Sequence, residues 1–189
     1  MKLVDRKSLS DIIIAWLGVV ALIVGGLFAG YQYLDKVAAV RVKEALSYVE
    51  QFNKPPIYNM RFKIEKIWLE HSKKLNEVLQ PSATNKQYHD FVLQLIKTQK
   101  IETEIMLLIQ FFETLETCST KRICDTKVVH SFFGGYARSF YHLHYPFIVQ
   151  WRQDWNDPSF AKGIETFAKP SRQCAKGIHK RSKDEILNL

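Results

Sequence analysis

The sequence has few of the residues that make tight turns, and few cysteines. Its 189 residues include eight glycines, six prolines and three cysteines. A β-sandwich or barrel with many short strands needs more turn residues than this, so the composition argues against such folds. The patterns C-x-x-C, H-E-x-x-H and G-x-x-x-x-G-K-S/T, which mark common zinc sites and phosphate-binding loops, do not occur. We therefore expect no metal or cofactor, and we do not expect an enzyme.

Charge is missing from one long stretch near the N-terminus. The 23 residues of 12–34 contain no charged side chain. About 20 apolar residues in a helix span the hydrocarbon core of a bilayer, and Trp16, Tyr31 and Tyr33 lie near the ends, where aromatic side chains favour the interface. The apolar part of a removable signal peptide is usually shorter and is followed by small residues at the cleavage site. We therefore predict an uncleaved transmembrane helix over 12–34, preceded by a short tail over 1–11.

Small residues follow one face of this predicted helix. Gly18, Ala21, Gly25 and Ala29 are spaced by three, four and four positions, so they align in one stripe. Such a stripe allows a second membrane helix to approach closely. We expect the stripe to contact either a second copy of the chain or a membrane protein partner.

The side of the membrane on which the rest of the chain lies is left open by the charges and the cysteines. Three basic residues precede the predicted span closely and three follow it, so the positive-inside rule gives a tie. Cys118 and Cys124 are close enough in sequence to pair. A disulfide between them would indicate an extracytoplasmic domain, whereas free thiols would indicate the cytosol.

Hydrophobic residues recur at helical spacing through the rest of the chain. This pattern predicts helices over residues 38–52, 58–80, 86–116, 126–155 and 158–168. Pro55-Pro56 ends the first of these helices, and Gly134-Gly135 and Pro146 are candidate bends in the fourth. Asp157 is expected to cap the last helix. The sequence thus predicts an all-α protein, in which an N-terminal transmembrane helix is followed by a bundle-like soluble domain over 35–168.

The C-terminal tail is basic. The whole chain carries a net charge of +8, and residues 169–189 contain six basic and two acidic side chains with little apolar periodicity. We predict that this tail is disordered and contacts anionic lipid or a protein partner. Binding of nucleic acid is not favoured, because no RNA-recognition or zinc-finger pattern is present.

Several polar residues lie among strongly apolar positions. His142 and His144 are two positions apart, so on one helix their rings point to opposite faces and do not converge on a metal. Glu113, Arg138 and Arg152 are costly to bury unless they are paired. We predict a structural ion pair between Glu113 and Arg138 or Arg152. The alternative is that these residues line a ligand pocket.

The segment from Phe111 to Phe167 resembles a family of small bacterial proteins that have an N-terminal membrane helix and an uncharacterised helical domain. The residues that carry the resemblance are Phe112-Glu113, Asp125, Phe133, Pro146-Phe147-Ile148, Arg152 and the stretch from Phe160 to Phe167. That family usually has glycine before the aspartate, where this chain has Cys124. The resemblance implies a helical domain on the cytoplasmic side of the membrane, and it carries over no catalytic residue.

These observations favour a membrane-anchored interaction module, such as an accessory subunit of a membrane complex, that contacts lipid and a membrane protein partner. The alternative from a different class is a membrane-bound sensor or enzyme. Its ligand pocket would lie among the aromatic residues of helix 126–155, with Glu113 and Arg152. A third hypothesis is that the basic tail recruits nucleic acid.

Overall fold

The computed structural model describes the backbone of residues 4–80 and 83–169. These residues form helices and turns without a strand, which confirms the all-α prediction. The chain divides into two compact units, residues 1–41 and 42–189. The basic tail predicted over 169–189 lies outside the described residues except for its first residue, so its disorder stays a prediction.

The first unit is the larger part of one long helix, α1 (Val4–Phe52), which continues into the second unit. The predicted membrane segment 12–34 lies within α1, and the tail predicted over 1–11 is helical from Val4 onward. Within Trp16–Phe52, the most apolar window has a mean hydropathy of 1.7, and none of that window is buried. Among the described helices, this one is long and apolar enough to cross a membrane; a signal sequence near the N-terminus can also meet these criteria of length and composition.

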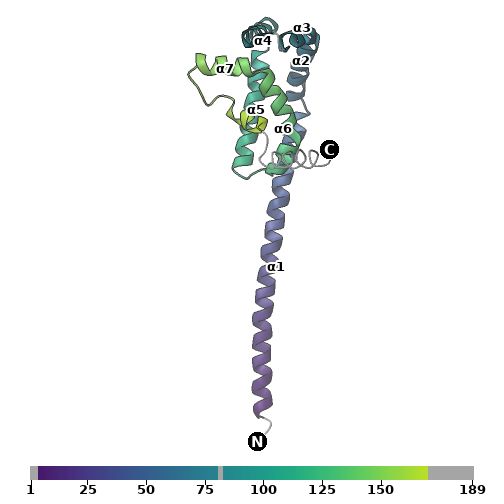
Figure 1. Cartoon of the computed structure of the whole chain (residues 1–189). Helices are drawn as coiled ribbons and strands as arrows, with labels where there is room; N and C mark the ends of the chain where they lie inside the picture. The colour runs from purple at the N-terminus through teal and green to yellow at the C-terminus, as the bar shows by residue number, and fades with distance from the viewer. Residues whose placement is uncertain (1–3, 81–82, 170–189) are drawn as a thin grey trace, which may run out of the picture. The chain divides into compact units, whose positions relative to one another are not determined.

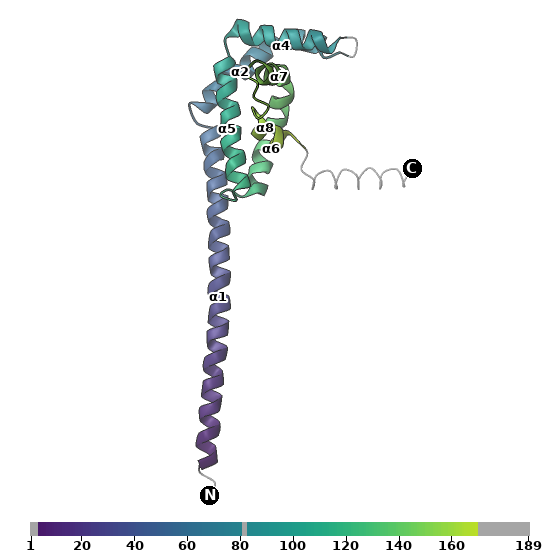
Figure 2. The ribbon, with the colours of Figure 1, turned by 90° about the vertical axis from the view of Figure 1, so that its left-hand side faces the viewer.

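Seven helices follow α1 in the described part of the chain. They are α2 (Ile57–Glu70), α3 (Ser72–Val78), α4 (Asn85–Gln99), α5 (Glu102–Thr120), α6 (Thr126–Leu143), α7 (Tyr145–Asp154) and α8 (Lys162–Ala168). In Figures 1 and 2, α5 and α6 lie side by side within the second unit, and α8 packs against both. Helix α2 packs on α5, while α4 contacts α3 and α7. Helices α2, α7 and α8 thus pack on a central pair formed by α5 and α6, and α3 and α4 pack on α2 and α7.

The core of the second unit is a cluster of aromatic rings around Phe52, the last residue of α1. Its ring stacks on Phe111 of α5 at 5.4 Å and meets Phe133 and Tyr136 of α6 edge-on, each at 5.1 Å. Phe112 joins the cluster at 6.3 Å. Edge-to-face and offset pairs at these distances contribute energy beyond the burial of apolar area. The cluster therefore fixes the end of α1 against both central helices.

One cation completes this cluster. The guanidinium of Arg61, on α2, lies 3.9 Å from the centre of the Phe52 ring and 5.0 Å from that of Tyr136. It also donates a hydrogen bond of 3.1 Å to the Phe52 carbonyl oxygen, which lies beyond the last intrahelical bonds of α1. Arg61 thus ties α2 to the end of α1 through a cation–π contact and a helix cap.

The sequence did not decide whether two of the cysteines form a disulfide, and in the structure they do. Cys118, near the end of α5, forms a disulfide with Cys124, just before α6. Both residues are buried. The bond closes the turn between the two central helices.

The prediction of one helix over 86–116 is wrong, because the chain breaks at Lys100. Lys100 has a left-handed backbone with φ of 53°, and the Ile101 amide donates to the Ile96 carbonyl oxygen at 3.3 Å. This is the hydrogen-bond pattern of a helix end at which glycine is the usual residue. Ile96 and Ile101 are both fully buried. Their burial offsets the strain of a non-glycine residue, which the sequence pattern does not reveal.

The prediction of one helix over 126–155 is also wrong. This segment forms α6 and α7, with the break at His144 and Pro146 in the first turn of α7. Pro146, expected as a bend, thus starts a new helix, where its missing N–H costs no hydrogen bond. Gly134 and Gly135 lie inside α6.

Two further predicted helices differ from the structure. The segment 58–80 is divided at His71 into α2 and α3. The last helix begins at Lys162 and not at residue 158. Asp157 accordingly caps a turn: its side chain accepts hydrogen bonds from the Ser159 amide and hydroxyl at 2.9 and 2.5 Å.

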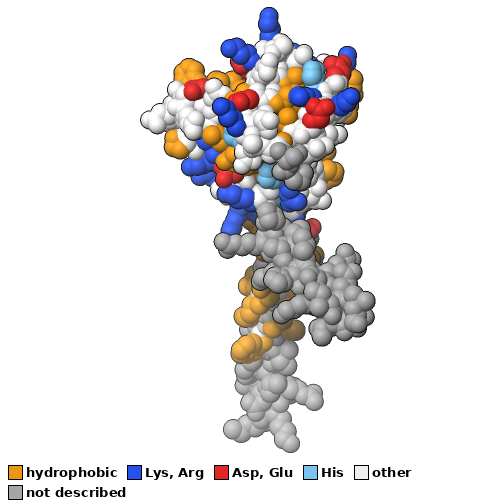
Figure 3. Space-filling view, turned by 45° about the horizontal axis from the view of Figure 1, so that its top comes forward, with side chains coloured by type: hydrophobic (Ala, Val, Ile, Leu, Met, Phe, Trp, Pro, Cys, Tyr) orange, Lys and Arg blue, Asp and Glu red, His pale blue; other side chains and the backbone are white. Residues whose placement is uncertain are grey.

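The surface of the second unit mixes charge of both signs with apolar side chains, as the face in Figure 3 shows. On α2, the exposed rings of Tyr58 and Phe62 stack on each other at 6.3 Å, and Leu69 is also exposed. Scattered apolar side chains are common on protein surfaces. These residues therefore do not by themselves define a binding site.

We expect Phe52→Ala to lower the free energy of unfolding of the domain by about 3–5 kcal/mol, because it leaves a cavity inside the ring cluster. Urea denaturation of the full chain in detergent, followed by circular dichroism, measures this loss. The matched control is Phe62→Ala, at an exposed ring, for which we expect a change within about 0.5 kcal/mol. Equal effects of the two substitutions would contradict the central role of Phe52.

Candidate functional site

The small-residue stripe of the first unit is exposed along its whole length. Gly18, Ala21, Gly25 and Ala29 are all accessible on α1. A Cβ atom built on Gly18 or Gly25 meets no other atom within 4 Å. The stripe therefore has no packing partner among the described residues, and its predicted contact with a second helix is not tested by one chain.

Glu113 of α5 is half-buried and holds the start of α8. Its Oε1 atom accepts a hydrogen bond of 2.7 Å from the backbone N–H of Gly163. Burial raises the pKa of the Glu113 carboxyl, and the bond from Gly163 partly opposes this rise. A Cβ on Gly163 would lie 2.8 Å from the Glu113 Cα, so only glycine allows the two helices to approach this closely.

The predicted ion pair between Glu113 and Arg138 or Arg152 is wrong. Arg152 of α7 pairs instead with Glu165 of α8, with an N–O distance of 3.0 Å, and its Nε donates to the Phe160 carbonyl oxygen at 2.8 Å. Arg138 of α6 donates from Nε to the Ala168 carbonyl oxygen at 3.2 Å.

The three candidate residues therefore share one role that the sequence did not indicate. They come from α5, α6 and α7, and each bonds to the segment 160–168. Helix α8 has seven residues, too few to be stable alone, so it depends on such contacts. Glu113, Arg138 and Arg152 thus hold the last described helix in place.

The two histidines face different directions, as the sequence predicts. His142 is exposed, whereas His144 is 1% exposed. The His144 Nε2 accepts a hydrogen bond of 3.1 Å from the Trp68 indole, and its Nδ1 lies 2.8 Å from the Phe140 carbonyl oxygen. This arrangement needs a neutral ring with its proton on Nδ1. Burial lowers the pKa of His144 to about 4, which keeps the ring neutral.

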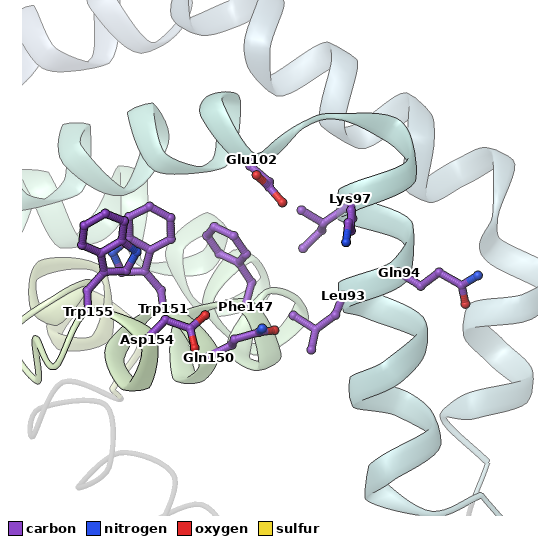
Figure 4. Close-up of a pocket in the computed structure, with 10 residues that line it drawn as sticks. Leu93, Gln94, Lys97, Glu102, Phe147, Gln150, Trp151, Asp154 and Trp155 are labelled. Atoms are coloured by element: carbon purple, nitrogen blue, oxygen red, sulfur yellow. The ribbon is translucent and has the colours of Figure 1, made fainter.

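One pocket lies between α4, α5 and α7 and has a volume of about 600 Å³. Figure 4 shows the indoles of Trp151 and Trp155 side by side at one end and Lys97 at the other. The two indoles stack at 5.4 Å, and Trp155 is 68% exposed. Glu102 and Asp154 add two carboxylates to the lining.

This pocket differs from the one considered in the sequence. Its aromatic residues come from α7 and from Trp155 just after it, within the predicted helix 126–155, but Glu113 and Arg152 do not line it. Glu113 lines a second pocket of about 580 Å³ between α5 and the turn before α8, together with Asp157 and apolar side chains. Glu113 and Arg152 thus do not line the pocket that holds the aromatic residues.

The pocket between α4, α5 and α7 is lined by aromatic, aliphatic, amide and charged side chains. Its lining contains no serine, cysteine or histidine that could act as a nucleophile or as a base near neutral pH. Within the described residues, no group of three or more His, Cys, Asp or Glu side chains gathers to hold a metal. What the pocket offers is a flat apolar surface, formed by two stacked indoles, beside polar and charged groups.

A family pattern described as "Domain of unknown function (DUF4760)" matches residues 19–171. The chain belongs to this family. The match confirms the resemblance to a family with an uncharacterised helical domain, and it extends well beyond Phe111–Phe167. No curated protein and no solved structure matches the chain.

The DUF4760 match covers most of α1 as well as α2–α8, so the long helix and the helical domain belong to one family unit. Sequence reasoning missed two contacts inside this unit. These are the Arg61 contact with Phe52 and the Trp68–His144 hydrogen bond. Each joins residues on different helices, and no local motif marks either one.

We expect the stability of this DUF4760 domain to fall as the pH drops from 6.5 toward 4, because the folded state resists protonation of His144. The pKa of His144 is lowered from 6.5 to about 4, so its contribution is complete above 6.5 and is lost toward 4. The loss amounts to about 3 kcal/mol. Urea denaturation at a series of pH values measures it.

The comparison variant is His144→Gln, whose amide oxygen can still accept a hydrogen bond from Trp68 but does not titrate. Between pH 6.5 and 4, the variant should lose about 3 kcal/mol less stability than the unmodified chain. His142→Gln, at an exposed ring, should leave the pH dependence unchanged. Identical pH profiles for His144→Gln and the unmodified chain would contradict the role of His144.

Proposed function

We propose that this DUF4760 protein is a single-pass membrane protein whose helical domain is an interaction module, in the manner of an accessory subunit of a membrane complex. The observation that carries the proposal is the charge-free segment 12–34 within an exposed helix. An exposed apolar helix of this length needs a bilayer or a partner to cover it.

The arrangement of polar residues supports binding over catalysis. Glu113, Arg138 and Arg152 are engaged in holding α8, and no serine, cysteine or histidine lines the pocket between α4, α5 and α7. The surfaces left for function are therefore the exposed face of α1, the basic residues and the pocket.

The disulfide supports an extracytoplasmic position for the domain. Cys118 and Cys124 are bonded, and such bonds persist in oxidising compartments but are rare in the cytosol. The balanced charges on the two flanks of 12–34 are compatible with this orientation. We therefore propose the side opposite to the one that the family resemblance implies.

The stripe on α1 is the proposed contact with a second membrane helix. Its small side chains leave the backbone accessible, so a partner helix can approach closely and gain van der Waals contact. That partner is either a second copy of this chain or another membrane protein.

A second candidate function is recognition of a ligand in the pocket between α4, α5 and α7. The observation that favours it is the stacked pair of Trp151 and Trp155, with Trp155 largely exposed beside Lys97, Glu102 and Asp154. In this reading the domain is a membrane-bound sensor.

The proposed side of the membrane predicts how the disulfide reacts in intact cells. In a Cys174→Ser variant, a membrane-impermeant thiol reagent should label Cys118 and Cys124 only after treatment with an impermeant reductant. Labelling is read by a mass shift of the purified protein. Labelling that occurs only after the membrane is permeabilised, and that does not need a reductant, would contradict the proposal and place the domain in the cytosol.

The proposed helix contact predicts that Gly25→Leu weakens association in the bilayer roughly tenfold, because the added side chain separates the backbones. Crosslinking of the full chain in proteoliposomes measures the associated fraction. The control is Ile23→Phe, which enlarges a side chain on the opposite face of α1 and should change nothing. An unchanged associated fraction with Gly25→Leu would count against the stripe as a contact.

A further inference from the structure

The turn between α5 and α6 exposes basic and apolar side chains inside a closed loop. Lys121, Arg122 and Ile123 are exposed between the bonded Cys118 and Cys124. Neither Lys121 nor Arg122 forms an ion pair with another described residue. Their charges are therefore available to an anionic partner.

Lys127 adds a further exposed positive charge in the first turn of α6. The nearest acidic residue in sequence, Asp125, is occupied as the cap of that helix, where its side chain accepts the Val128 amide at 3.0 Å. The turn thus presents a mainly basic surface.

The exposure of Ile123 is unusual for its position at a helix end. The Ile123 amide donates to the Cys118 carbonyl oxygen at 2.9 Å, and Arg122 has a left-handed backbone with φ of 57°. In this type of helix end, the residue at the position of Ile123 commonly packs back on its own helix. Ile101 occupies the same position after α4 and is fully buried, whereas Ile123 is 54% exposed.

The turn lies at the end of the second unit where the chain enters it. Figures 1 and 2 both show the α5–α6 turn beside the part of α1 that enters this unit. Only eight residue steps separate Leu34, the end of the predicted membrane segment, from Val42, where the second unit begins. In a helix these steps span about 12 Å, so the start of the second unit is tethered within this distance of the end of the predicted membrane segment.

We propose that the closed loop 118–124 is a membrane-surface contact for anionic phospholipid. Ile123 enters the interfacial region, and Lys121, Arg122 and Lys127 bind lipid phosphate groups. A mixture of basic and apolar side chains is the chemistry that suits an anionic bilayer surface, and the disulfide keeps the loop in one conformation. This inference rests on the proposed membrane anchoring.

The test places the photocrosslinking amino acid p-benzoylphenylalanine at position 123 of the full chain in lipid nanodiscs. Nanodiscs of phosphatidylcholine alone are compared with nanodiscs that also contain phosphatidylglycerol. We expect lipid adducts at position 123, detected by mass spectrometry, with a yield roughly thirtyfold higher in the anionic nanodiscs, the order expected for two basic side chains near an anionic surface. Adding Lys121→Glu and Arg122→Glu should remove this gain.

Two controls make the outcome decisive. The same amino acid at position 69, where Leu69 is 74% exposed on α2, should give no lipid adduct. Charge reversal of Lys73 and Lys74, on α3, should leave the yield at position 123 unchanged.

Equal lipid yields at positions 123 and 69, or crosslinks at 123 to protein instead of lipid, would overturn the inference. Failure of the chain to enter nanodiscs at all would instead overturn the proposed membrane anchoring. The two failures are therefore distinguishable within one experiment.

Discussion

The burial of Phe52 is the contact on which the arrangement of the domain depends. Phe52 ends α1, and its ring touches α5 and α6 while Arg61 covers it from α2. One side chain thus joins four helices. Because protein interiors are closely packed, such a ring leaves little freedom in how these helices are placed around it. The junction between the long helix and the domain is therefore part of the hydrophobic core.

Polar side chains on α5, α6 and α7 serve the same structural purpose. Glu113, Arg138 and Arg152 bond to the segment around α8, and His144 bonds to Trp68 while remaining neutral. Buried polar groups need partners, and these residues find them inside the domain. The surfaces that these contacts leave free are the exposed face of α1, the indole-lined pocket and the basic turn between α5 and α6.

Helix boundaries show where the sequence pattern was insufficient. The predicted helix over 86–116 breaks at Lys100, a non-glycine residue in a left-handed conformation. Apolar spacing continues through the break, because Ile96 and Ile101 are both buried on its two sides. In the segment 126–155, Pro146 is a local signal for the break. The sequence pattern did not show that this proline starts a separate helix. Local signals mark a helix end where a capping side chain, glycine or proline is present, and Lys100 is none of these.

The sequence by itself determined the all-α class and the charge-free segment, because both depend on composition and on spacing along one stretch of chain. It also predicted that His142 and His144 point in different directions, from their separation by two positions. Only the tertiary structure decided the partners of Glu113 and of Trp68, which lie 50 and 76 residues away along the chain. Which helix faces meet depends on how every segment packs at once, and the spacing of residues within one helix holds no information about a neighbour that distant in sequence.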